Sequence, residues 1–160
     1  MFWSWLSTIL ILPFNVVVVI PAALLWFGGF AYTKPPLALS VAGYALAPLG
    51  LALAVWTCGL FHIIGKGTAA PWNPPKRLVI WGPYRFVRNP MIISVLMMVA
   101  AEAALFNSWP IAAWSLAFWA ANQFYYFPKI EEPKLLARFG EDYAEYKRHV
   151  RRWIPKSRGV

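Results

Sequence analysis

Long apolar runs separated by short polar segments dominate the chain. At 1.5 Å per residue, the first run reaches about 34 Å as a helix, enough to cross a hydrocarbon core of about 30 Å. We therefore predict an all-α integral membrane fold with about four transmembrane helices. The predicted spans are residues 10–32, 37–64, 91–106 and 109–127.

The last 33 residues follow a different pattern, in which apolar side chains recur at steps of three and four. This spacing predicts an amphipathic cytoplasmic helix, kinked at Gly140. The tail at residues 151–155 is expected to be an anchor at the membrane interface. The recurring positions are Leu135, Leu136, Phe139, Tyr143, Tyr146 and Val150.

Composition supports the membrane prediction. The 160 residues are 60% hydrophobic and 13% charged, with a mean hydropathy of +0.53. A soluble domain of this size has too much surface to bury so large an apolar fraction. We predict one domain over residues 1–160, in which 1–64 hold two N-terminal spans and 65–160 form the functional core.

The charge distribution predicts the orientation of the chain. The chain has fifteen Lys and Arg and six Asp and Glu, which gives a net charge of +9. The basic residues gather in residues 65–90 and 128–160, which we expect to be cytoplasmic along with both termini. Basic blocks beside apolar runs indicate anionic membrane lipids as partners rather than nucleic acid. The expected location is a bacterial or archaeal cell membrane.

Metal chemistry is not indicated. Cys58 is the single cysteine, and His62 and His149 are far apart in the sequence. We therefore expect neither an intrachain disulfide nor a metal site.

The two basic blocks contain more than charge. Residues 82–90 read GPYRFVRNP, and the second block opens with Glu131 and Glu132 where the last apolar run has ended. Adjacent carboxylates repel each other, so they need cations or hydrogen-bond donors nearby, and the first block supplies them. Residues 139–146 then read FGEDYAEY, and 152–155 read RWIP.

Residues 60–155 resemble the superfamily of isoprenylcysteine carboxyl methyltransferases and phospholipid methyltransferases. The shared signatures are GxYxxxRHPxY followed by EExxLxxxFGxxYxxY, with Asn89 and Ile92 in place of the usual His and Tyr. The resemblance implies a methyltransferase that uses S-adenosylmethionine as cofactor. Its acceptor would be a hydrophobic, membrane-embedded molecule, lipid-like or prenylated.

The resemblance also implies roles for individual residues. Arg88 and Glu132 are the catalytic candidates. Gly65 and Gly67 match a GxG cofactor motif, although a turn that ends a helix is the simpler explanation. Independently of the resemblance, the polar residues within the predicted spans, Glu102, Asn122 and Gln123, are candidate substrate contacts, and the resemblance adds Phe127. The implied cofactor contacts are Leu78, Val79, Gly82, Tyr84, Asn89, Pro90 and Glu131.

Two of these assignments have alternatives. Glu102 could contact the acceptor, or it could form a structural hydrogen bond with Asn122 or Gln123. An acceptor amine would need a base, for which Glu132 or His62 is the candidate, whereas a carboxylate or thiolate would need none.

Two other functions fit parts of the sequence. One is a small four-helix transporter with Glu102 as its coupling carboxylate. The other is a non-catalytic relative of the family. Cofactor binding separates the methyltransferase from both.

Overall fold

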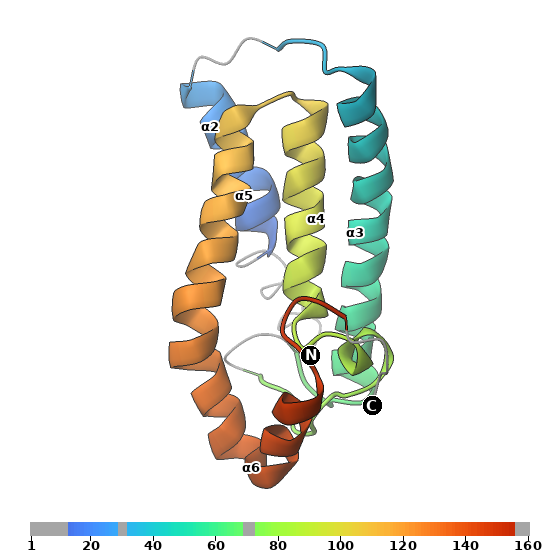
Figure 1. Cartoon of the computed structure of the whole chain (residues 1–160), viewed down its shortest axis with the longest axis vertical. Coiled ribbons are helices and arrows are strands. Elements are labelled where there is room, and N and C mark those ends of the chain that lie inside the picture. Colours follow the sequence, from blue (N-terminus) through green and yellow to red (C-terminus); the bar gives the residue numbers. More distant parts are fainter. Residues whose placement is uncertain (1–12, 29–31, 69–72, 156–160) are drawn as a thin grey trace. The chain divides into compact units, whose positions relative to one another are not determined.

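The computed structural model describes residues 13–28, 32–68 and 73–155, whose regular elements are all helical (Figure 1). An all-α fold is thus confirmed for this part of the chain. The elements are η1 (Asn15–Val19), α2 (Ile20–Phe27), α3 (Leu37–Ile63), η2 (Gly82–Arg85), α4 (Pro90–Leu105), α5 (Trp109–Ala121), η3 (Asn122–Glu131) and α6 (Glu132–His149).

The chain forms two compact units. The first comprises Met1–Leu53 and Ser94–Trp119, and the second comprises Ala54–Ile93 and Ala120–Val160. Helices α3, α4 and α5 each contribute residues to both units.

Among the described residues, only α3 is long and apolar enough to cross a membrane by length and composition. Its 27 residues reach about 40 Å at 1.5 Å per residue. Helix α4 and the segment Asn15–Phe27 are apolar but shorter. Four transmembrane helices therefore remain a prediction. The predicted first span is described only in part, since residues 10–12 and 29–31 lie outside the described ranges.

Prolines shape the two π-helical segments in the same way. In a π-helix each N–H bonds the carbonyl five residues earlier, and proline has no N–H to donate. Pro21 follows η1, and the Val16 carbonyl, five residues before it, accepts a hydrogen bond from Trp114 Nε1 at 3.1 Å. A side chain from another helix thus replaces the missing backbone donor.

The core of the first unit is apolar. Val95, Val99 and Ile111 are buried, and partly buried side chains from η1, α2, α4 and α5 pack against them. Asn107, at φ 48°, turns the chain between α4 and α5, and its Nδ2 donates to Thr33 Oγ1 at 3.0 Å.

Close approach of α3 and α4 within this unit depends on glycine. A Cβ on Gly50 would lie 3.0 Å from the Ser94 carbonyl oxygen, a backbone atom that cannot rotate away. We expect Gly50→Ala to destabilise the fold by about 1–3 kcal/mol, because it overpacks the helix contact. Gly59→Ala is the matched control in the same helix, where a Cβ meets nothing within 4 Å. Thermal unfolding in detergent compares the two, and equal midpoints would contradict this account.

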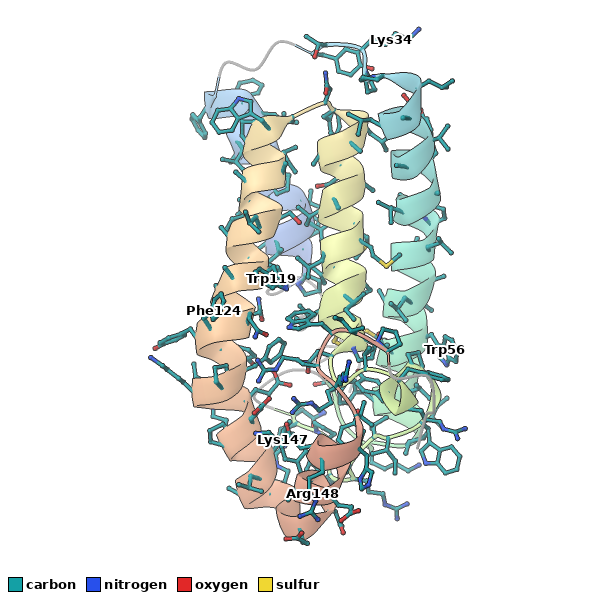
Figure 2. The ribbon with its side chains drawn as sticks, in the orientation of Figure 1. Lys34, Trp56, Trp119, Phe124, Lys147 and Arg148 are labelled. Carbon is teal, nitrogen blue, oxygen red and sulfur yellow. The ribbon has the colours of Figure 1, made fainter. Side chains whose placement is uncertain are left out.

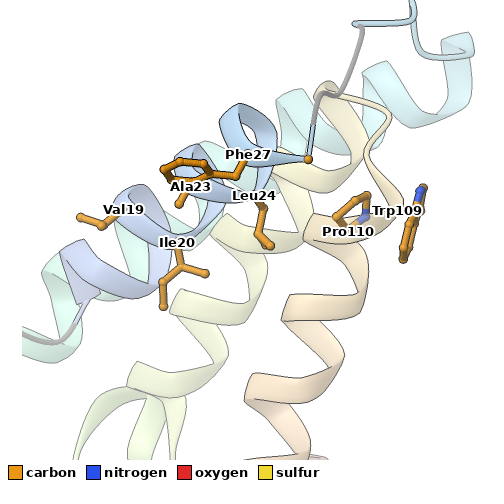
Figure 3. A pocket seen from close by; sticks show the side chains of 8 residues that line it. Val19, Ile20, Ala23, Leu24, Phe27, Trp109 and Pro110 are labelled. Carbon is orange, nitrogen blue, oxygen red and sulfur yellow. The ribbon is translucent and has the colours of Figure 1, made fainter.

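An apolar hollow of about 570 Å³ also lies in the first unit (Figure 3). It has no ionisable side chain in its wall, so it offers no chemistry of its own. Its lining residues are Val19, Ile20, Ala23, Leu24, Phe27, Gly28, Trp109 and Pro110.

Candidate active site

Glu132, at the start of α6, is the centre of an ion-pair cluster in the second unit. Its Oε1 accepts hydrogen bonds from Arg88 Nη1 at 2.9 Å and Arg152 Nη2 at 2.6 Å. Its Oε2 accepts one from Lys147 Nζ at 2.6 Å, and Figure 2 labels Lys147 on α6. One nearly buried carboxylate thus joins the loop before α4, the end of α6 and the C-terminal tail.

The cluster fixes the charge of Glu132. Burial alone would raise its pKa, but hydrogen bonds from Lys147 and Arg152, with the charge of Arg88, outweigh burial and lower the pKa. A carboxylate that is ionised and already bound to three cations is a poor proton acceptor. The contacts therefore favour a role for Glu132 in holding segments together over the role of base.

Glu131 has the opposite character. It is half-buried, and no ion pair in the described part of the chain includes it. Burial, together with the charge of Glu132, raises the pKa of Glu131 to about 7, against the opposing effect of Arg152. This carboxylate remains available to a ligand.

Gly82 starts the 3₁₀ turn η2 of the GPYRFVRNP loop with a φ of +60°. The positive φ favours glycine, and a Cβ there would also crowd two side chains, at 2.9 Å from Leu60 Cδ1 and 3.3 Å from the Trp56 ring. The structural demand accounts for Gly82, and its predicted cofactor contact stays a prediction.

Tyr84 is buried in the same loop, with its ring edge-on to Phe61 at 5.6 Å. Its backbone carbonyl accepts a hydrogen bond from the Tyr146 hydroxyl at 2.7 Å. Its own hydroxyl is buried and has no hydrogen-bond partner among the described residues. A buried polar group without a partner is costly, which makes this hydroxyl a candidate ligand contact.

Other predicted cofactor residues also have packing roles. Val79 is buried, with its Cγ2 3.2 Å from where a Cβ on Gly65 would lie. Leu78 packs against the cluster of Tyr143, Tyr146 and Val150 on α6 and just after it. Pro90 is the first residue of α4, and the Asn89 carbonyl accepts the Ile93 amide at 3.2 Å.

Gly65 and Gly67 end α3, as the simpler interpretation of the GxG run holds. The Gly65 amide bonds the Leu60 carbonyl at 3.2 Å, and a Cβ on Gly67 would lie 2.7 Å from the Pro74 carbonyl oxygen. The end of helix α3 and the close packing of the backbone explain both glycines.

Gln123 and Phe127, the predicted substrate contacts, contact the tail in this structure, and their role toward substrate stays a prediction. Gln123 Oε1 accepts from Arg152 Nη1 at 2.9 Å and from Trp153 Nε1 at 2.6 Å. Phe127 is 1% exposed and lies 5.5 Å from the Arg152 guanidinium and 5.7 Å from the Trp153 ring. Arg152 and Trp153 thus face the protein, and the expected interface anchor stays a prediction. The RWIP run marks this segment in the sequence, but it does not indicate that Arg152 and Trp153 contact Gln123 and Phe127.

The two remaining predicted substrate residues belong to different units. Asn122 is buried at the start of η3 in the second unit. Glu102 is on α4 in the first unit, where its Oε2 is buried without a hydrogen-bond partner in the described ranges. Both proposed roles of Glu102 remain predictions.

Comparison with known families bears on the whole of this site. A family model described as phospholipid methyltransferase matches residues 38–142, more than half of the chain. The match includes the GPYRFVRNP loop and both glutamates, and it confirms the resemblance inferred from them. No match was found among curated proteins or among solved structures. The chain belongs to the phospholipid methyltransferase family.

Proposed function

We propose that this protein transfers a methyl group from S-adenosylmethionine to a lipid-like acceptor held in the membrane. Family membership supports the reaction class. The observation that carries the proposal is Glu131: a half-buried carboxylate left outside an ion-pair cluster that saturates its neighbour Glu132.

The polar atoms of the second unit fit the groups of the cofactor. Arg88 Nε and Arg152 Nε are buried and unpartnered in the described ranges, and can donate to a carboxylate. Glu131 can accept from ribose hydroxyls, and the Tyr84 hydroxyl can donate or accept. Burial raises the pKa of Tyr84 most, and the charges of Tyr146, Cys58 and Glu131 raise it further. When bound, the cofactor supplies an activated methyl group.

The remaining task of the protein is to hold the acceptor atom in line with the methyl group and to exclude water. Neither Asn89, an amide, nor Glu132, bound to three cations, is suited to take a proton. The site therefore favours an acceptor that is already nucleophilic, such as a prenylated or lipid-linked carboxylate or thiolate. An amine acceptor would have to lose its proton to Glu131 or to solvent.

A second candidate function is transport, with Glu102 as the coupling carboxylate. The observation that favours it is the Glu102 Oε2 atom, buried without a hydrogen-bond partner in the described part of the chain. Such carboxylates within apolar helices mark ion pathways in many membrane proteins.

Calorimetric titration of detergent-solubilised protein with S-adenosylhomocysteine tests the proposal. A ligand that requires ionised Glu131 binds only the deprotonated form, so affinity should rise with pH and level off above about 7. Absence of binding to well-folded protein would overturn the proposal. Ion-flux measurements in vesicles with Glu102→Gln would then test the transporter.

Replacing Tyr84 by Phe separates ligand contact from packing. The change removes only a buried hydroxyl without a partner, so we expect an unfolding midpoint equal to or above that of the wild type. If the hydroxyl meets the cofactor, affinity for S-adenosylhomocysteine should fall about two- to tenfold, the effect of one neutral hydrogen bond. Unchanged affinity would remove Tyr84 from the site.

A further inference from the structure

Arg152, in the C-terminal tail, contacts several residues of the candidate site. Its Nη2 bonds Glu132, and its Nη1 bonds both the side-chain oxygen and the backbone carbonyl of Gln123, at 2.9 and 3.1 Å. The guanidinium also lies over the Phe127 ring, and the side chain is only 16% exposed. One residue near the C-terminus therefore connects α6 with the first turns of η3.

The backbone of η3 explains why a side chain is needed there. Pro128 has no N–H, and in π-helical geometry its missing partner is the carbonyl five residues earlier, that of Gln123. Arg152 Nη1 satisfies this carbonyl. Trp114 does the same for Val16 before Pro21. An Arg can serve Gln123 and Glu132 together because its planar head donates in several directions, whereas Lys has a single nitrogen.

The tail backbone extends the same connection to the signature loop. Val87 and Arg151 form an isolated parallel bridge, and the Arg88 amide donates to the Arg151 carbonyl at 2.9 Å. Arg88 also shares Glu132 Oε1 with Arg152. The loop, Glu132 and η3 thus meet at one tail residue and its neighbour.

We propose that Arg152 is a positioning residue for methyl transfer: its guanidinium fastens the tail to η3 and Glu132, and so holds Glu131 and the GPYRFVRNP loop in the arrangement that receives the cofactor. This inference rests on the proposed function. The charge of Arg152 also opposes the protonation of Glu131, lowering a pKa that burial and Glu132 raise. Arg152 therefore acts on the cofactor site through Glu131 as well as through the backbone.

The test compares Arg152→Gln and Arg152→Lys with Arg148→Gln. Arg148 is an exposed residue of α6 (Figure 2) whose ion pairs are with exposed Glu141 and Glu145 on the same helix, which makes it a matched charge-removal control. Each purified variant is titrated with S-adenosylhomocysteine and assayed for KM and kcat with S-adenosylmethionine in vesicles containing extracted prokaryotic membrane lipids. Hydrogen–deuterium exchange is measured at residues 86–90 and 122–131 without cofactor.

We expect Arg152→Gln to raise the KM for the cofactor and the Kd of its product at least tenfold, with a smaller change in kcat, and to increase exchange in both segments. Arg152→Lys should be intermediate, because it keeps the charge near Glu132 but cannot also serve Gln123. Arg148→Gln should match the wild type. If Arg152→Gln does not fold, Arg152→Lys carries the test with at least a threefold rise in KM.

Two contrary results have different meanings. A wild-type protein that binds S-adenosylhomocysteine, with Arg152 variants that bind it within twofold, would overturn the positioning role alone. A wild-type protein that does not bind would overturn the proposed function, and with it the inference. Increased exchange in Arg152→Gln would then show only that Arg152 holds the tail to η3 and Glu132.

Discussion

Replacing Glu132 by Ala is expected to destabilise the protein by about 3–5 kcal/mol, which is the usual cost of removing one partner from a buried ion pair. The side chain is 10% exposed and neutralises Arg88, Arg152 and Lys147. Without it, three cations would repel one another in a partly buried environment with no carboxylate to neutralise them. Glu132→Gln keeps the shape and one acceptor oxygen but not the charge, so its effect should be smaller. Thermal unfolding in a fixed detergent measures both.

Glu145→Gln is the control for this prediction. Glu145 lies in the same helix and pairs with Arg148, but both side chains are mostly exposed. Exposed pairs contribute little because water screens them. We therefore expect the unfolding midpoint of Glu145→Gln to equal that of the wild type. Equal midpoints for Glu132→Ala and Glu145→Gln would show that the cluster does not stabilise the fold.

Glu131→Gln should have the opposite phenotype to that of Glu132→Ala. The substitution removes a carboxylate that burial holds at a pKa of about 7, so stability should be unchanged or improved at pH 8. The sign follows from linkage: folding raises the pKa of Glu131, so its ionisation costs stability as pH rises through about 7. Cofactor affinity should fall about ten- to a hundredfold, the effect of losing a hydrogen bond to a charged acceptor.

The measurement is a calorimetric titration with S-adenosylhomocysteine at pH 8, paired with thermal unfolding of the same sample. The expected result is that Glu131→Gln weakens cofactor binding without lowering stability, whereas Glu132→Ala lowers stability. A Glu131→Gln variant with wild-type affinity would place the cofactor elsewhere. A variant with a lower midpoint at pH 8 would show that Glu131 has a structural partner.

Much of the helical pattern follows from the apolar runs. The second run was predicted over residues 37–64 and forms α3 at Leu37–Ile63, and the third was predicted over 91–106 and forms α4 at Pro90–Leu105. The kink at Gly140 is confirmed by a φ of 54° within α6. Hydrophobic periodicity and glycine are local signals, so they can be read from the sequence.

The continuity of α5, η3 and α6 was not predictable in the same way. Pro128 argues for a helix end near Phe127, as the fourth predicted span assumed. The structure continues as a π-helix through Pro128, and the Gln123 carbonyl finds its donor in Arg152. That donor is 29 residues away in the sequence, and no local pattern indicates the contact.

The candidate site, too, was predictable from the sequence only in part. The need of Glu131 and Glu132 for nearby cations was inferred from electrostatic repulsion, and Arg88 from the first block does bind Glu132. The different environments of the two glutamates were not predictable, because they depend on burial and on the folded-back tail. Lys147 and Arg152 read in the sequence as members of a basic block.

Transfer of a labelled methyl group tests most directly whether the protein methylates a lipid-like acceptor. Purified protein in vesicles containing extracted prokaryotic membrane lipids is incubated with S-adenosylmethionine carrying a labelled methyl group. We predict label in the organic-extractable fraction above a protein-free blank, and at least tenfold less with Glu131→Gln. Absence of label from that fraction, with well-folded protein and across lipid and prenylated acceptors, would contradict the account.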